Sequence, residues 1–164
     1  MTGSVTHSTA SPSAALIWGQ WLVSAYVVWH WALGYVTGGV LFGLLPSGVA
    51  GQLMAHLLQA AYFGAFVGLI ALWALGWRAR EIRRHRSPFW LLVAFVALTL
   101  NAMWVSPLMT TLKQPETMLY WGMNFSFWHG VSQFLYLVSW GAVAWWGLSL
   151  MRLSRQSRPT TTSV

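Results

Sequence analysis

Charged side chains are confined to a few short segments of this chain, and the four stretches between them are long enough to cross a membrane. Residues 14–45, 49–77, 89–112 and 118–151 contain no Lys, Arg, Asp or Glu. A membrane-spanning helix needs about 20 predominantly apolar residues, and each stretch reaches that length. Since 57% of the residues are hydrophobic and only 7% are charged, against about a quarter in soluble domains, the sequence predicts a membrane protein.

We therefore predict an all-α fold, an integral membrane bundle of four transmembrane helices at about residues 15–45, 49–77, 88–112 and 117–151. The transmembrane domain occupies residues 14–151. Disordered tails are expected on both sides, over residues 1–13 and over the basic segment 152–164, because both are rich in Ser, Thr or Pro. The first stretch is too long for the apolar part of a signal peptide, so we expect it to be retained as a helix.

Basic residues predict the orientation in the membrane. Four crossings place both termini and the loop 78–87 on one side, which then holds eight of the nine Lys and Arg residues. By the positive-inside rule this side is cytoplasmic, so the expected location is the cytoplasmic membrane with both termini inside. The Arg-rich loop fixes the topology, and binding of anionic lipid headgroups is an alternative role for it. No nucleic-acid partner is expected, since the net charge of +7 lies where topology requires it.

Tryptophans follow the same arrangement, because the indole ring prefers the headgroup level. Those expected to anchor the cytoplasmic helix ends are Trp18, Trp21, Trp73, Trp77, Trp90, Trp145 and Trp146. Small residues at four-residue spacing predict close helix packing within the bilayer. These ladders are Gly34 and Gly38; Gly39 and Gly43; Ala60, Gly64 and Gly68; and Gly122, Ser126 and Gly130.

Uncharged polar residues fall into stripes at helical spacing inside three of the predicted spans. The stripes are Tyr26, His30 and Thr37; Gln52, His56 and Gln59; and His129, Ser132, Gln133 and Tyr136. The third span adds Asn101. Because polar groups at membrane depth normally face the bundle interior, we predict a buried polar site around His129 and Asn101, with Ser132, Gln133, His30 and His56 as further candidates. These side chains either lock helix packing or bind a small ligand.

Two sharper readings stay open. Counting from Pro46 and Pro115 at 1.5 Å per residue places His30 and His129 at a similar depth, roughly 20 to 25 Å, where two histidines could ligate a haem. Met103, Met109, Met118 and Met123 gather near the non-cytoplasmic ends, and thioethers with imidazole suit Cu(I). Methionine more commonly fills gaps in apolar packing, and neither pattern commits the sequence to a metal or another cofactor.

Several short motifs follow one another between about Tyr35 and Tyr136. They include Tyr35-Val-Thr-Gly-Gly-Val-Leu-Phe42, Asn101-Ala-Met-Trp104 and the His-Gly-x-Ser motif at His129 to Ser132. Their order resembles that of the transmembrane protein 205-like family, a DUF4149-type membrane domain of unknown function. The resemblance implies a four-helix integral membrane protein and brings no established activity with it. The matching positions are Pro46, Gly51, Asn101, Pro107, His129, Gly130 and Ser132.

The sequence thus predicts a multi-pass integral membrane protein without enzymatic activity, since the spans carry no carboxylate for general acid or base chemistry. A small solute or metal-ion transporter is the first alternative, and it would require an oligomer because four helices seldom enclose a wide path. A haem- or quinone-linked redox subunit is the second. The lipid bilayer is the expected partner, and a homo-oligomer is left open.

Overall fold

The chain folds into four long helices, each long and apolar enough to cross a membrane. The structure is a computed structural model, and it describes residues 14–79, 88–113 and 119–156. The spans measure 31, 32, 25 and 28 residues, or about 38 to 48 Å at 1.5 Å per residue. They therefore exceed the hydrocarbon core of about 30 Å and extend into the headgroup layers. The predicted all-α membrane bundle of four transmembrane helices is confirmed.

Two of the four spans are broken helices, and two are continuous. The first consists of α1 (Ala14–Trp31), a π-turn η1 (Ala32–Val36) and α2 (Thr37–Leu44). The second is the continuous helix α3 (Ser47–Arg78). The third repeats the first, with α5 (Pro88–Leu100), a π-turn η2 (Asn101–Val105) and α6 (Ser106–Leu112), and the fourth is the continuous helix α7 (Phe125–Gln156).

The π-turns arise where the regular helix is interrupted. In η2 the Ser106 N–H donates to Asn101 O, five residues back, and Pro107 follows directly. Proline has no N–H and its ring crowds the carbonyl four residues earlier, so a wider turn relieves the clash. In η1 the Thr37 N–H donates to Ala32 O, again five residues back, and no proline is near. Here the turn surrounds Gly34, which lies against a tyrosine ring described below.

The fourth span begins later than predicted. The sequence places its start near residue 117, but α7 begins at Phe125. Tyr120 and Met123 pair across a tight turn in which Trp121 and Gly122 have positive φ angles of 51° and 74°, which a helix cannot accommodate. The helix is then capped by Asn124, whose Oδ1 accepts a hydrogen bond of 3.1 Å from the Phe127 N–H.

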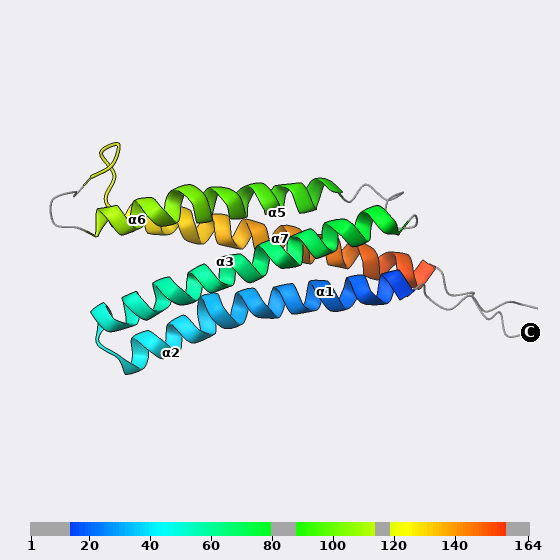
Figure 1. The fold of residues 1–164 in the computed structure, drawn as a ribbon, viewed down its shortest axis with the longest axis horizontal. Coiled ribbons are helices and arrows are strands. Elements are labelled where there is room, and N and C mark those ends of the chain that lie inside the picture. The colour runs from blue at the N-terminus through cyan, green and yellow to red at the C-terminus, as the bar shows by residue number, and fades with distance from the viewer. Residues whose placement is uncertain (1–13, 80–87, 114–118, 157–164) are drawn as a thin grey trace, which may run out of the picture.

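The four spans form two hairpins. The first span packs against α3, and α5 packs extensively against α7, while α1 and α7 join the two hairpins. We call the side with the turn at Pro46 the Pro46 end and the opposite side the Arg78 end. The hairpins lie together at the Arg78 end and diverge toward the Pro46 end, where α2 contacts α3 and α6 contacts α7 (Figure 1).

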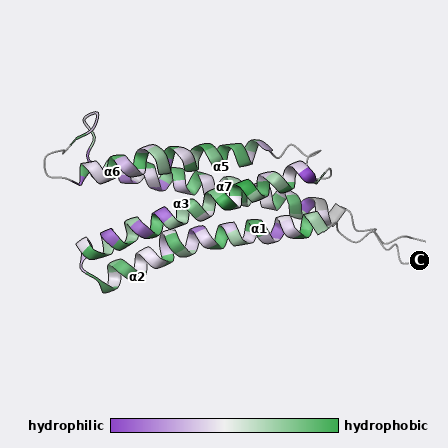
Figure 2. Cartoon of the chain, in the orientation of Figure 1, coloured by the Kyte–Doolittle hydropathy of each residue, from purple (hydrophilic) through white to green (hydrophobic). Residues whose placement is uncertain are grey.

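The half of the bundle near the Arg78 end has a closed, apolar core. Its fully buried side chains include Leu69, Leu72, Leu98, Val143 and Trp146. Trp146 was predicted to anchor at the membrane surface, but none of it is exposed, because it lies on the face of α7 that points into this core. Its neighbour Trp145 is 51% exposed and suits the anchor role. In Figure 2 hydrophilic residues gather instead on α3 toward the Pro46 end.

Only part of the predicted small-residue packing is present. A Cβ placed on Gly64 would lie 2.6 Å from Trp29 Nε1, and one on Gly68 would lie 3.0 Å from Tyr26, so these glycines permit close contact between α1 and α3. Nothing in the described structure lies within 4 Å of such a Cβ on Gly39, Gly43 or Gly130. These three positions face away from the neighbouring helices, whereas a Cβ on Gly38 would lie 3.4 Å from Met54 on α3.

Candidate functional site

His30 lies at the centre of the bundle, enclosed by two tyrosines. Its side chain is 1% exposed, and its ring stacks on Tyr26 with 4.2 Å between ring centroids. The ring of Tyr136 packs against it at a tilt of 39°, with 4.7 Å between centroids. Nδ1 lies 3.2 Å from Tyr26 O. Because a carbonyl can only accept, Nδ1 carries the proton of that bond, and Nε2 is the acceptor in a neutral imidazole. Tyr136 Oη donates to His30 O over 3.0 Å, which ties α7 to α1 next to η1.

His30, Tyr26 and Tyr136 form part of a polar layer, and two more hydrogen bonds extend this layer across the bundle. The hydroxyls of Tyr26 on α1 and Ser139 on α7 share a buried hydrogen bond of 2.8 Å. Asn101, which is completely buried, donates from Nδ2 to Ser132 O over 3.0 Å and joins η2 to α7. Ser132 and Tyr136 are one turn apart on α7, so Asn101 and His30 hold neighbouring turns of the same helix. Tyr62 on α3 completes the layer, with its ring 6.4 Å from that of Tyr136.

Two acceptor atoms of this layer have no partner. His30 Nε2 and Asn101 Oδ1 are both buried and make no hydrogen bond within the described structure. A buried polar atom without a partner costs about 1 to 3 kcal/mol. Since both atoms accept hydrogen bonds, the group that suits them is a donor, such as a water molecule or a ligand hydroxyl or amine.

His129 is not part of this layer. The sequence places it in the buried site, but its side chain is exposed in the structure and stacks on Phe125 at 5.8 Å between centroids. Because α7 begins at Phe125 and not near residue 117, His129 lies about 6 Å from the helix start at 1.5 Å per residue. This depth is that of the headgroups, where an exposed histidine needs no buried partner.

The remaining candidate site residues differ in how far they are buried. Ser132 is buried with Asn101, Gln133 is half-buried, and His56 is exposed on α3 together with Gln52 and Gln59. Gln59 lies one turn from Tyr62 toward the Pro46 end, and Gln133 lies one turn from Tyr136 in the same direction. Both glutamines therefore lie one turn nearer the Pro46 end than the two tyrosines, Gln59 exposed on α3 and Gln133 half-buried on α7.

The geometry does not bring the proposed haem and copper ligands together. His30 is enclosed between two tyrosine rings, whereas His129 is exposed closer to the Pro46 end, so the two imidazoles do not flank a common space. Met103 is 73% exposed and Met123 is 43% exposed, while Met118 lies outside the described residues. Among residues 14–79, 88–113 and 119–156, no group of three His, Cys, Asp or Glu side chains could hold a metal ion.

The structure adds members that the sequence did not rank. Tyr26 and Tyr136 enclose His30, and Ser139 and Tyr62 extend the layer, yet none of the four was a candidate site residue. The polar stripes carry a signal for all four. Tyr26 lies four residues before His30, and Tyr136 closes the stripe that begins at His129, so both are on the predicted polar faces. Tyr62 lies three residues after Gln59 and Ser139 three after Tyr136, so each continues a predicted stripe by one turn beyond the residues assigned to it.

Comparison with known protein families assigns the chain to a family. A family model described as a domain of unknown function (DUF4149) matches residues 16–116, more than half of the chain. The chain belongs to this family. The match covers the DUF4149 region from α1 through α6 and so includes His30, Tyr62 and Asn101. It ends before α7, so the His-Gly-x-Ser motif at His129 lies beyond it, and the narrower resemblance to transmembrane protein 205-like proteins stays a prediction. Neither a curated protein nor a solved structure matches the chain.

Proposed function

We propose that this DUF4149 protein is a non-enzymatic membrane protein that binds a small ligand rich in hydrogen-bond donors between its two helix hairpins. The observation that carries the proposal is the pair of unpartnered acceptors, His30 Nε2 and Asn101 Oδ1, buried at the depth where the hairpins begin to diverge. A donor ligand reaching this layer would satisfy both atoms. A purely structural layer would gain nothing from leaving them without partners.

Polar side chains between the His30 layer and the Pro46 end favour access of water from that end. Gln59 lies about 18 Å along α3 from its start at Ser47, and Gln133 lies about 12 Å along α7 from Phe125. At such depths an amide facing acyl chains would lose its hydrogen bonds with water. Water or a polar ligand between the hairpins would restore them, so these glutamines suit the wall of a hydrated vestibule.

The Arg78 end supports a site open to one side of the membrane. The apolar core from Leu69 to Leu72 on α3 and from Val143 to Trp146 on α7 is tightly packed. Within the described part of this core, the indole N–H of Trp146 is a buried polar group without a partner, and the other side chains of the cluster between Leu69 and Leu72 and between Val143 and Trp146 are apolar. The proposed site is therefore a vestibule that ends at the His30 layer.

Cysteine labelling tests the proposal directly, because the chain contains no cysteine and each variant has a single thiol. Gln59→Cys and Gln133→Cys, in sealed proteoliposomes, are treated with a membrane-impermeant maleimide from the Pro46 side. The matched controls are the adjacent positions Ala60→Cys and Phe134→Cys, whose side chains are exposed but belong to other faces of the same helices. We expect both glutamine positions to react and both controls to stay unlabelled.

Each outcome of this experiment is informative. Labelling of the glutamine positions that is slowed by a polyol or a small amine would support a ligand site and indicate its class. Equal labelling of glutamine and control positions would overturn the vestibule, since it would mean general exposure. If neither glutamine position is labelled and both cysteine variants form disulfide-linked dimers on oxidation, the vestibule is overturned and these positions lie in an interface between two copies.

Transport of a small solute is the second candidate, and the two π-turns favour it. Both broken spans change from α-helix to π-turn at the polar layer, so α2 and α6 begin where the closed half of the bundle ends. Wide turns of this kind are frequent at functional sites. Uptake of donor-rich solutes into proteoliposomes that falls on Asn101→Leu, in a variant that remains folded, would support transport. Binding without uptake would leave the protein as a receptor or a binding module.

The last part of the proposal concerns the orientation of the protein in the membrane, its lipid partner and its oligomeric state. We place the Arg78 end on the cytoplasmic side of the cytoplasmic membrane, with both termini inside, because the Arg-rich loop and the basic C-terminal segment share that side. Anionic headgroups are the proposed lipid partner there, and a homo-oligomer is the state that transport would require. A fluorescent reporter at the C-terminus that is active only in the cytoplasm tests the orientation, and inactivity in the wild-type protein would reverse it.

A further inference from the structure

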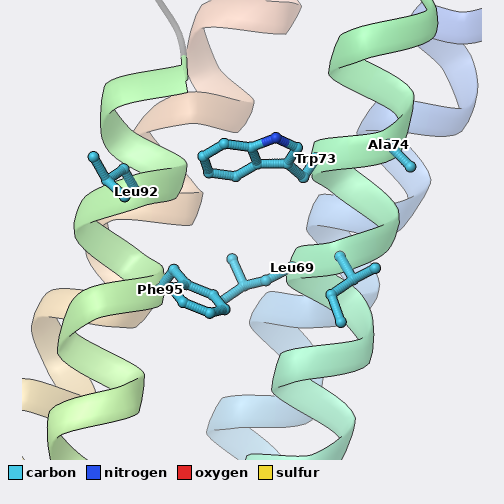
Figure 3. A pocket seen from close by; sticks show the side chains of 6 residues that line it. Leu69, Trp73, Ala74, Leu92 and Phe95 are labelled. Carbon is cyan, nitrogen blue, oxygen red and sulfur yellow. The ribbon is translucent and has the colours of Figure 1, made fainter.

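A groove opens between α3 and α5 near the Arg78 end, on the side away from the polar layer. Its volume is about 420 Å³, and it is lined by Leu69, Ile70, Trp73, Ala74, Leu92 and Phe95. Figure 3 shows Leu92 and Phe95 of α5 facing Leu69 and Trp73 of α3 across this space.

The lining has the chemistry of a seat for an acyl chain. Every side chain is hydrophobic, and Ile70 and Leu92 are 62% and 47% exposed, so the groove is open toward the bilayer. A quinone ring would need hydrogen-bond donors at the bottom of the groove, and none of the lining side chains provides one there. The single polar atom is the indole nitrogen of Trp73, which in Figure 3 lies on the side of the ring away from Leu69 and Phe95.

A positive charge stands directly beyond the groove. Ile70 and Ala74 line it, and Arg78 follows four residues later as the exposed last residue of α3. Residues four apart share a helix face, and the Cα–Cβ bond tilts toward the helix N-terminus, so the stem of Arg78 leans back toward Ala74. Arg78 lies about 6 Å along the helix from Ala74, the distance over which a chain in the groove would reach its headgroup. Long basic side chains at this level extend to the headgroup layer.

We propose that the groove holds one acyl chain of an anionic phospholipid, with its phosphate on the Arg78 guanidinium. In this arrangement the indole N–H of Trp73 donates to an ester carbonyl of the lipid, a role suited to its depth at the membrane interface. The charge of Arg78 selects the anionic headgroup, and the apolar walls select nothing beyond an acyl chain. This inference rests on the orientation and the headgroup contact proposed above, and it is independent of the vestibule at the Pro46 end.

Native mass spectrometry of the full chain in detergent tests this site, with phosphatidylglycerol and phosphatidylcholine as probes. We expect the wild-type protein to retain one phosphatidylglycerol more tightly than any phosphatidylcholine and to unfold at a higher temperature with it. Ala74→Phe fills the groove and should abolish the tight binding of one lipid. Arg78→Gln should weaken phosphatidylglycerol binding about fivefold and phosphatidylcholine binding less, because the choline cation already offsets the charge of the phosphate in that lipid.

A matched control separates these effects from general disturbance of the bundle. Ala25→Phe introduces the same ring at an exposed position on α1, away from the groove, and should bind phosphatidylglycerol as the wild type does. Equal binding of the two lipids by the wild type would overturn the headgroup selection. Unchanged lipid binding in Ala74→Phe would show that the lipid does not occupy the groove. A wild-type dimer that contains no lipid and that Ala74→Phe dissociates would show that the groove is occupied by a second copy of the chain. Neither result would bear on the labelling of Gln59 and Gln133.

Discussion

The hydroxyl of Tyr136 donates a hydrogen bond of 3.0 Å to the backbone carbonyl of His30, two residues before the π-turn η1 begins. This bond joins the last regular turn of α1 to the middle of α7. Because Tyr136 also packs its ring on the imidazole of His30, one side chain both fixes the histidine and secures the two hairpins to each other. The predictions for Tyr136, Gly34 and His30 below concern this contact and the polar layer around it.

Removal of the Tyr136 hydroxyl should lower stability without opening a cavity. Tyr136→Phe keeps the ring contacts with His30 and Tyr62 but leaves the His30 carbonyl without this donor. We expect a loss of about 0.5 to 2 kcal/mol in the free energy of unfolding, as found for buried hydrogen bonds in proteins and membranes. Equilibrium unfolding in mixed micelles measures it. Tyr35→Phe is the control, since its hydroxyl has no hydrogen-bond partner within the described structure, and an equal loss in both variants would contradict the prediction.

Glycine substitutions should separate close contacts from open positions. A Cβ on Gly34 would lie 2.7 Å from Tyr136 Cε1 and 2.9 Å from its Oη, so Gly34→Ala must displace the tyrosine. We expect this variant to lose about 1 to 3 kcal/mol, the usual effect of overpacking. Gly39→Ala, five residues later, meets nothing within 4 Å and should be neutral or stabilise by up to about 1 kcal/mol through helix propensity.

A double substitution checks that the tyrosine is the cause. In a Tyr136→Leu background, Gly34→Ala should be less destabilising than in the wild type, because the ring that it displaces is gone. The unfolding temperatures of the four proteins give the coupling between the two positions. If Gly39→Ala alone were as harmful as Gly34→Ala, then α2 would have a partner outside this chain.

Loss of the N-cap of α7 should destabilise the first turn of that helix and leave the rest of the bundle unchanged. Asn124→Ala removes the acceptor of the Phe127 N–H and should cost about 1 kcal/mol, while Asn124→Asp should retain the cap. Hydrogen exchange of the amides in the first turn of α7 is the measurement, with faster exchange expected only in the alanine variant. Faster exchange in both variants would mean that the amide group of Asn124 acts through another contact.

Much of the fold could be predicted from the sequence because a bilayer leaves few options. A stretch without charge that is long enough to cross must be a helix, since its backbone groups find no other partners, and so the gaps between charges give the four spans. The start of α7 could not be read in this way. Pro115 and Glu116 resemble a helix start, and only the backbone angles of Trp121 and Gly122 reveal the turn that delays it.

The candidate site depended on the same boundary. Depth was counted from Pro115, so the later start of α7 moves His129 from the middle of the membrane to its edge. Asn101 and His30 do not depend on it and are buried. The π-turn at Pro107 had a sequence signal in the proline, whereas the one around Gly34 reflects the approach of Tyr136, a contact 102 residues away in the chain that no local pattern contains.

Replacement of His30 separates a structural role from a ligand-binding role. His30→Phe keeps a ring between Tyr26 and Tyr136, removes the unpartnered Nε2 and gives up the 3.2 Å bond of Nδ1 to the Tyr26 carbonyl. Relief of a buried acceptor without a partner is worth about 1 to 3 kcal/mol, similar to or larger than the loss of one hydrogen bond. We therefore expect the ligand-free variant to stay within about 1 kcal/mol of the wild type or to exceed it in stability.

His30→Ala is the comparison, because it leaves a cavity between the two tyrosines and should lose about 2 to 5 kcal/mol. Unfolding in detergent gives both values, and protection of Gln133→Cys from labelling by a bound solute gives the ligand readout. For a binding site we expect His30→Phe to preserve stability and to abolish protection, because the acceptor is gone while the packing remains. A phenylalanine variant that loses as much stability as the alanine variant would show that Nε2 already has a structural partner, and the ligand proposal would lose its main support.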